Sequence, residues 1–214
     1  MAKNEYRGLF IAFEGLDGSG ASIQAALLQN YLEKQGYRVL LTHEPTANLL
    51  GGMIRASLKA EWKIGSRGLQ LMFAADRAQH LELEIIPALT AGKIVIVDRY
   101  VMSSIAYGSH HKPELMTWLQ ALNQPFVTPD LTFVVNVRPS ICALRMEHSR
   151  YENLGMFKQV EALFEVWKVY EDLAKRYYNV HVIDGEREEM EIMGEITDLT
   201  DDALGTGKPL SRDR

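Results

Sequence analysis

The sequence predicts an α/β protein in three layers, with a five-stranded parallel sheet and helices on both of its faces. Five short apolar runs, each suited to one buried strand, alternate with segments of helical periodicity. Neither an internal repeat nor a low-complexity linker interrupts this alternation, which is typical of parallel sheets covered on both sides. The 214 residues are enough for one substantial core. We therefore assign residues 1–204 to a single domain and residues 205–214 to a disordered tail.

The predicted strands are short, mostly apolar runs that end in polar or turn-forming residues. They are Leu9–Phe13, Arg38–Thr42, Ile94–Val97, Leu131–Val137 and Val180–Ile183. Helices are predicted where apolar residues recur every three or four positions, at residues 22–35, 68–86, 114–122, 139–147, 157–173 and, more weakly, 192–199. Pro87 bends or restarts the second helix. The polar stretch after the fourth helix predicts a short lid at about residues 145–156.

Composition excludes several classes of protein. The formal net charge of −5 argues against a broad nucleic-acid footprint, so no nucleic acid polymer is expected as a partner. Cys142, the one cysteine, has no internal partner for a disulfide. No apolar run approaches the roughly 20 residues that span a bilayer, and the N-terminus has no signal-peptide pattern. We therefore expect a cytoplasmic protein without a membrane partner.

A glycine-rich turn between the first strand and the first helix predicts a phosphate-binding loop. Gly15, Gly18 and Gly20 lie where backbone N–H groups must approach a polyphosphate at a helix N-terminus. The P-loop signature G-x-x-x-x-G-K-[ST] fits at Gly15, Gly20 and Ser22, but Ala21 stands in place of its lysine. The alternative interpretation is a tight strand-to-helix turn that binds nothing.

Further polar residues follow the other predicted strands. In parallel α/β sheets, ligands bind outside the carboxyl ends of the strands. The segments that follow these ends are residues 15–22, 43–46, 98–100 and 184–185. We therefore expect these four segments to be neighbours in space and to line one ligand crevice.

These and other segments resemble the thymidylate kinase family of P-loop nucleoside monophosphate kinases, in family order across nearly the whole chain. The matches lie within residues 13–24, 44–45, 72–80, 98–107, 129–131 and 150–152. The helix around Phe73 and the strand end Asp98-Arg99-Tyr100 are the specific parts, because many ATPases and GTPases share the glycine loop. The resemblance implies a P-loop NTPase fold and transfer of the γ-phosphoryl group of ATP to dTMP, giving dTDP.

The resemblance also implies roles for individual residues. It implies ATP binding by Gly15, Leu16, Asp17, Gly18, Ser19, Gly20, Ala21, Ser22 and Arg145. It implies dTMP binding by Asp17, Phe73, Arg77, Arg99, Ser104 and Tyr107. By the same resemblance Asp98, Arg99 and the lid residue Arg150 are catalytic, and Ser22 and Asp98 hold Mg²⁺.

Spacing and chemistry suit several of these implied roles. Phe73 and Arg77 are i and i+4 on one helix face, so a ring can stack on a pyrimidine while a guanidinium donates to its carbonyl edge. The alternative is that Phe73 is core and Arg77 lies on a solvated face. Arg99 suits an acceptor phosphate because a guanidinium is a planar, bidentate donor.

Ala21 keeps two alternatives to the dTMP kinase open. The chain could be a nucleotide-binding pseudoenzyme that lost useful turnover with the lysine, or a kinase for another pyrimidine nucleoside or nucleotide. Our hypothesis for a functional enzyme is that a lid arginine, first of all Arg150, carries part of the missing charge. The resemblance also implies a homodimer.

Overall fold

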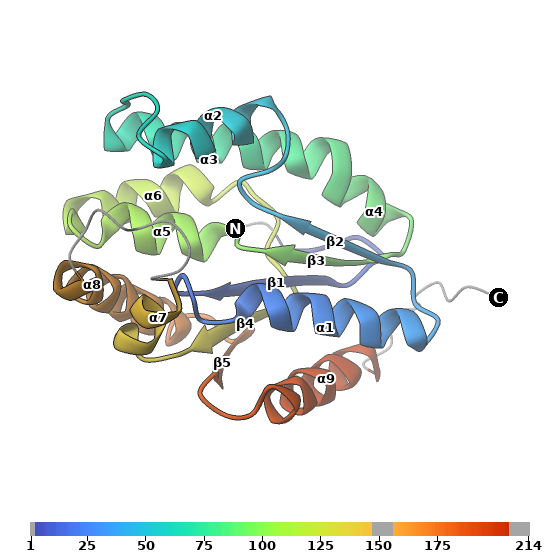
Figure 1. Ribbon diagram of the computed structural model, residues 1–214. Coiled ribbons are helices and arrows are strands. Elements are labelled where there is room, and N and C mark those ends of the chain that lie inside the picture. The colour runs from blue at the N-terminus through green and yellow to red at the C-terminus, as the bar shows by residue number, and fades with distance from the viewer. Residues whose placement is uncertain (1–2, 147–155, 206–214) are drawn as a thin grey trace.

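Residues 3–146 and 156–205 are described by a computed structural model of the chain, and they confirm the predicted α/β architecture (Figure 1). Five parallel strands form one sheet in the order β2-β3-β1-β4-β5. The strands are β1 (Phe10–Gly15), β2 (Val39–His43), β3 (Ile94–Asp98), β4 (Leu131–Asn136) and β5 (Val180–Asp184). Every predicted strand is found, with its ends shifted by at most two residues.

Helices cover both faces of this sheet. They are α1 (Ala21–Lys34), α2 (Leu49–Leu58), α3 (Ser66–His80), α4 (Ile86–Thr90), α5 (Val101–Ser109), α6 (Met116–Asn123), α7 (Pro139–Met146), α8 (Met156–Ala174) and α9 (Glu189–Gly205). Helices α1 and α9 pack side by side on one face, and α5 and α8 pack on the other (Figure 1). Among the described helices, none is both long and apolar enough to cross a membrane.

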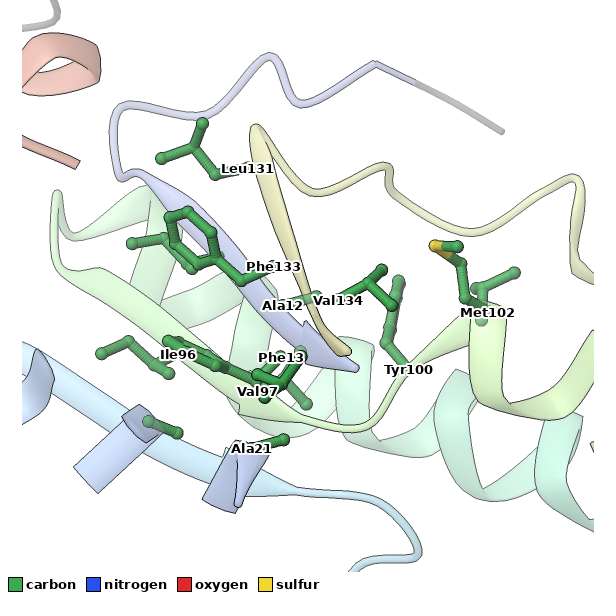
Figure 2. Packing of buried hydrophobic residues seen from close by; sticks show 14 of the residues in the cluster. Ala12, Phe13, Ala21, Ile96, Val97, Tyr100, Met102, Leu131, Phe133 and Val134 are labelled. Atoms are coloured by element: carbon green, nitrogen blue, oxygen red, sulfur yellow. The ribbon is translucent and has the colours of Figure 1, made fainter. Parts of the chain in front are cut away.

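The core lies on the inner strands, whose side chains are buried on both faces of the sheet (Figure 2). Phe13 of β1 and Phe133 of β4 pack with ring centroids 5.3 Å apart. Ile96 and Val97 of β3 are fully buried. Burial of one such side chain stabilises the fold by about 1.5–3 kcal/mol, and burial on both faces explains why these strands read as continuous apolar runs.

The register brings the predicted polar segments to one edge of the sheet. Asp98 at the end of β3 lies opposite Phe13 of β1 on one side and opposite His43 of β2 on the other. Gly15, at the end of β1, lies opposite Val135 of β4. The segments that follow β1, β2 and β3 therefore begin next to one another, as the sequence predicts.

Helices α2 and α5 are absent from the sequence-based assignment. The pair Gly51-Gly52 lowers the helix propensity of α2, yet a Cβ on Gly51 would lie 1.9 Å from the carbonyl oxygen of Thr46, so the close approach of this helix to the preceding loop needs a glycine. Helix α5 begins directly after Arg99-Tyr100, and the side chain of Tyr100, its N-cap residue, makes no capping hydrogen bond. Its N-terminus is completed by Glu14 of β1, as described below.

The long helix ahead of Pro87 changes its hydrogen bonding rather than simply bending. Between α3 and α4 the chain forms a π-helix at Leu81–Ile85, in which the N–H of Ile86 bonds the carbonyl oxygen of Leu81, five residues earlier. A shorter helix, α6, replaces the predicted helix at 114–122, because Pro113–Leu115 forms a 3₁₀ turn. The predicted lid at 145–156 falls mostly on residues 147–155, and the predicted tail mostly on 206–214; both stretches lie outside the described residues.

Candidate nucleotide-binding site

The phosphate loop, defined as residues 15–22, depends on glycine for its shape. Gly15, Gly18 and Gly20 have φ angles of 151°, 82° and 91°, a region that side chains disfavour. A Cβ on Gly18 would lie 2.7 Å from the carbonyl oxygen of Cys142 in α7. The loop is therefore packed closely against α7, and this packing needs a glycine at position 18.

Gly20 and Ala21 form the start of α1. Gly20 is the N-cap residue in a left-handed conformation, and no side chain caps the helix. The first N–H groups of a helix have no intrahelical acceptor, so this end of α1 offers donors to an anion. Ala21 itself is buried and its methyl group joins the hydrophobic core (Figure 2). The position that carries a cation in the P-loop signature thus contributes packing only.

Two arginines reach the phosphate loop from other elements. Arg99 Nη1 donates to the carbonyl oxygen of Gly15 over 3.0 Å, and its Nη2 lies 2.6 Å from Asp17 Oδ1. Arg145, exposed at the end of α7, donates from Nη1 to the carbonyl oxygen of Gly18 over 3.2 Å. Burial lowers the pKa of Arg99, but Tyr107 and Asp17 raise it, and the net shift is upward. The guanidinium of Arg99 therefore stays charged.

Asp98 and Ser22 form an oxygen pair beside the loop. Ser22 Oγ donates to Asp98 Oδ2 over 2.5 Å. Asp98 Oδ1 is buried and has no hydrogen-bond partner among the described residues. Hydroxyl and carboxylate oxygens are the ligands that Mg²⁺ prefers, and this ion usually completes its shell with water and phosphate oxygens. The pair therefore fits Mg²⁺, although the described residues hold no cluster of three or more His, Cys, Asp or Glu side chains suited to a metal.

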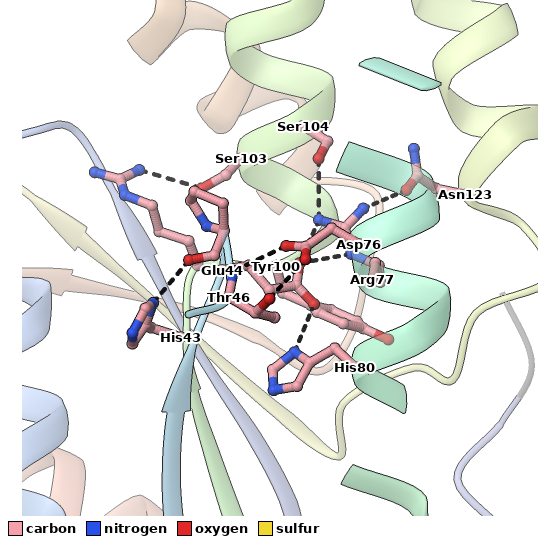
Figure 3. Close-up of polar contacts among 12 residues, drawn as sticks. His43, Glu44, Thr46, Asp76, Arg77, His80, Tyr100, Ser103, Ser104 and Asn123 are labelled. Carbon is pink, nitrogen blue, oxygen red and sulfur yellow. Dashed lines mark hydrogen bonds and ion pairs between the residues drawn. The ribbon is translucent and has the colours of Figure 1, made fainter. Parts of the chain in front are cut away.

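Arg77 is buried in a polar cluster rather than solvated, so that alternative interpretation is wrong (Figure 3). Its Nε and Nη2 lie 2.8 and 2.7 Å from Glu44 Oε2. Nη2 also donates to Ser104 Oγ over 3.0 Å, and Nη1 donates to Asn123 Oδ1. The guanidinium carbon lies 4.9 Å from the ring centroid of Tyr100. The ring centroid of Phe126 lies 5.7 Å from the same carbon, so three polar side chains and two rings fix the plane of the guanidinium.

Two further residues of α3, Asp76 and His80, bind the loop that follows β2. Asp76 accepts hydrogen bonds from the N–H of Thr46 at 2.8 Å and from its hydroxyl at 2.6 Å. His80 Nδ1 lies 3.1 Å from Glu44 Oε1. The peptide bond between Glu44 and Pro45 is cis. Asp76 and His80, which make the helix face polar, thus fix the loop that carries Glu44.

Asp17, Arg99 and Tyr107 form a second group, which α5 joins to the Arg77 cluster. The N–H of Asp17 donates to the hydroxyl of Tyr107 over 3.0 Å. The guanidinium carbon of Arg99 lies 5.4 Å from the ring centroid of Tyr107. Ser104, one turn before Tyr107, contacts Arg77. The structure thus brings together five of the six predicted dTMP-binding residues through direct contacts and α5, while Phe73 lies partly buried one turn before Arg77 on α3.

Some residues of this site were not assigned roles from the sequence. Glu44, Asn123, Ser103 and Tyr170 contact the arginines or their partners, and Glu14 lies beneath them. Glu14 carries a usable signal, because a charged residue inside an apolar strand must have buried partners. No sequence pattern distinguishes Asn123 or Tyr170. Arg150, predicted to be catalytic, lies outside the described residues.

Comparison with known proteins points to one family. A sequence model for thymidylate kinase matches residues 13–196. A probable thymidylate kinase of Thermococcus gammatolerans is 35% identical over 208 residues, covering 94% of this chain and 99% of that protein. One of Pyrococcus horikoshii is 39% identical over 184 residues, covering 83% and 88%. A thymidylate kinase of Bifidobacterium longum subsp. infantis is 40% identical over 158 residues, covering 69% and 68%.

Proposed function

Because the chain belongs to the thymidylate kinase family, we propose that its nucleotide site uses Arg99 and Arg77 to hold dTMP and the phosphate loop to hold ATP. The enzyme is an ATP-dependent kinase that transfers the γ-phosphoryl group of ATP to dTMP. An oxygen of the acceptor phosphate forms a bond to the γ-phosphorus while the bond from that phosphorus to the β,γ-bridging oxygen breaks. The products are dTDP and ADP.

One observation carries the proposed roles. Arg99 contacts the phosphate loop, and α5, which begins two residues later, carries both Ser104 and Tyr107 toward the other acceptor residues. Arg99 would bind the acceptor phosphate with two N–H groups. Phe73 would stack on the base and Arg77 would donate to its carbonyl edge. Asp17 would contact the sugar 3′-hydroxyl, and Tyr107 with Ser104 would exclude a 2′-hydroxyl.

The donor side would use the phosphate loop and two oxygens. Residues 15–22 offer backbone N–H groups to the polyphosphate, and Arg145 adds a cation beside Gly18. Ser22 and Asp98 would hold Mg²⁺, which neutralises phosphate charge when it is bound. Phosphoryl transfer depends mostly on such positioning and charge neutralisation, so this arrangement suits the reaction.

Because Ala21 replaces the lysine of the P-loop signature, another residue would have to supply positive charge to the transferred phosphoryl group. Arg99 and Arg145 both contact the loop, and Arg150 remains our first candidate for a cation that acts on the transferred group. A pseudoenzyme that binds nucleotides but does not turn them over is the competing proposal, and the missing lysine is the observation that favours it. Loss of one preorganised charged donor is typically worth about 10²–10³ in rate.

The test is formation of dTDP from dTMP and Mg-ATP, followed by chromatography of the nucleotides, with thymidine and UMP as alternative acceptors. We expect turnover on the order of 1 s⁻¹ or more, the lower end for kinases, and dTMP as the preferred acceptor. Arg150→Ala should lower kcat at least 100-fold. Arg38→Ala is the matched control, because Arg38 precedes β2 at the opposite edge of the sheet. Product from Ala21→Lys but none from the parent would establish the pseudoenzyme instead.

We also propose that the enzyme is a cytoplasmic homodimer that pairs through α2 and α3. Four apolar side chains on these helices are exposed: Leu49, Met53, Leu58 and Leu71. Contiguous exposed apolar surface marks association sites, and we propose that these four side chains contribute to one such surface. Sedimentation velocity should give a dimer for the parent and a monomer for Leu58→Glu. A monomeric parent would refute the dimer.

A further inference from the structure

Glu14 is a fully buried carboxylate directly beneath the acceptor side of the site. It lies in β1, one residue before the phosphate loop, and only 1% of its surface is exposed. Its two oxygens accept four hydrogen bonds, from the N–H groups of Tyr100 and Ser103 and from the hydroxyls of Ser103 and Tyr170. A buried carboxylate with this many partners fixes whatever it contacts.

One oxygen of Glu14 completes the N-terminus of α5. The first N–H groups of a helix need acceptors, and α5 has no side-chain cap of its own. Glu14 Oε1 accepts from the N–H of Tyr100 at 3.0 Å and from the N–H of Ser103 at 3.2 Å. The strand that leads into the phosphate loop therefore anchors the helix that follows Arg99.

The other oxygen of Glu14 reaches the guanidinium of Arg99 through a hydroxyl. Ser103 Oγ donates to Glu14 Oε2 over 2.5 Å and accepts from Arg99 Nη1 at 3.2 Å. The hydroxyl of Tyr170, from α8, lies 2.8 Å from Ser103 Oγ and 3.0 Å from Glu14 Oε2. Ser103 Oγ therefore lies within hydrogen-bond distance of Glu14, Arg99 and Tyr170, and the hydroxyl of Tyr170 contacts both Ser103 and Glu14.

Arg99 needs such support because its backbone is strained. Its φ angle is 68°, in the left-handed region, although it is not a glycine. Conformations of this kind cost on the order of 1–3 kcal/mol and persist only where the surroundings enforce them. Glu14 restrains both the backbone and the side chain of Arg99. It accepts a hydrogen bond from the N–H of Tyr100, the residue after Arg99, and it orders the side chain of Arg99 through Ser103.

We propose that Glu14, Ser103 and Tyr170 are positioning residues that hold Arg99 in its strained conformation and direct its guanidinium to the acceptor phosphate. In this proposal they act through Arg99 and not through contacts of their own with the nucleotide. This role rests on the proposed function, in which Arg99 binds the phosphate of dTMP. It assigns Tyr170, which is fully buried in the helix after the predicted lid, a purpose beyond packing.

The decisive variants each remove one hydroxyl and leave the packing in place. Tyr170→Phe keeps the ring, and Ser103→Ala removes a single oxygen. Tyr31→Phe is the matched control, because it makes the same chemical change where Tyr31 donates to Asp201 between α1 and α9. Binding of dTMP and of thymidine, measured by isothermal titration calorimetry, separates contacts to the phosphate from contacts to the nucleoside.

We expect Tyr170→Phe and Ser103→Ala to weaken dTMP binding about fivefold to tenfold, the usual effect of one lost hydrogen bond to a charged network. Thymidine binding should stay within twofold of the parent, and Tyr31→Phe should change neither. Ser103→Thr, which keeps the hydroxyl, should bind dTMP more tightly than Ser103→Ala and close to the affinity of the parent. In steady-state assays the KM for dTMP should rise while the KM for ATP stays constant.

A double-mutant cycle with Arg99→Ala completes the test. If Tyr170 acts through Arg99, Tyr170→Phe adds no further loss of dTMP affinity in the Arg99→Ala background. Equal losses for dTMP and thymidine, unchanged dTMP binding, or a loss that persists without Arg99 would each overturn the positioning role alone. A parent that binds no dTMP at all would overturn the proposed function and the positioning role together.

Discussion

Ser22 Oγ donates a hydrogen bond to Asp98 Oδ2 over 2.5 Å, which joins the first turn of α1 to the end of β3. The contact links the two halves of the site, since Ser22 closes the phosphate loop and Asp98 precedes Arg99. The second oxygen of Asp98 stays buried without a partner among the described residues. This buried oxygen is available to accept a hydrogen bond or to bind the Mg²⁺ that we propose for this position.

Asp98→Asn should lower kcat by about 10²–10³ while dTMP binding changes less than threefold, because it removes charge from the reacting region but keeps the shape. Steady-state kinetics and calorimetry give the two quantities. Ser22→Ala should lower kcat as well, and the double variant should lose less than the sum, since the two oxygens act as a pair. Full additivity would show that they act separately.

Glu44→Ala should destabilise the protein by about 3–5 kcal/mol, because it leaves the buried guanidinium of Arg77 without its counter-charge. The free energy of unfolding from urea titrations measures this loss. Glu195→Ala removes the partner of Arg187 at a partly exposed pair and should cost less than about 1 kcal/mol. Similar losses for the two variants would mean that Arg77 does not depend on Glu44.

The thiol of Cys142 should be almost inert in the folded protein. Burial raises its pKa from the ordinary 9.0 to about 12, and the side chain is fully buried. The thiolate is the reactive form, so at pH 8 the shift alone slows alkylation about 1000-fold. Labelling with iodoacetamide in buffer and in urea, read by mass spectrometry, checks this. Rapid labelling of the native protein would show that α7 opens readily.

Stability should depend on pH through Glu14. Burial raises the pKa of this carboxyl, and hydrogen bonds from Ser103 and the charge of Arg99 oppose the shift only in part. A raised pKa in the folded state means that the folded protein holds its proton more tightly than the unfolded chain. The contribution of Glu14 to the free energy of unfolding is therefore fully present below pH 4.5, the ordinary pKa of a glutamate. This contribution is lost as pH rises through the raised pKa.

The matched variant for that pH dependence is Glu14→Gln, which cannot ionise. From pH 5 upward, the unfolding free energy of the parent should fall relative to that of Glu14→Gln, with a slope of at most about 1.4 kcal/mol per pH unit. Urea titrations across this range measure the difference. Parallel curves for the two proteins would mean that Glu14 titrates normally.

The sheet was predictable because its signals are local. The strands β1, β3 and β4 are buried on both faces and read directly as apolar runs, and the glycines of the phosphate loop mark the first turn. Helix α5 was not predictable in the same way. Its start is fixed by Glu14, 86 residues earlier, so no window of sequence around residue 101 contains the group that caps it.

The candidate site likewise combines features that local sequence indicates with contacts that only the fold reveals. The i, i+4 spacing of Phe73 and Arg77 indicates that both project from one face of α3. Spacing does not reveal that Arg77 is buried, because its partners Glu44 and Asn123 lie 33 and 46 residues away in sequence. Long-range pairings of this kind decide whether an arginine is solvated or fixed, and the sheet topology creates them.

The fixed guanidinium of Arg77 has a thermodynamic consequence. Three of its five N–H groups donate hydrogen bonds, to Glu44, Ser104 and Asn123, and its Nη2 also lies 2.7 Å from Glu44 Oε2. Its rotamer freedom is therefore lost when the chain folds, and a nucleotide that docks against it meets a preorganised donor. If Arg77 binds the base as we propose, its recognition adds little entropic cost, and any change that loosens the cluster should weaken folding and recognition together.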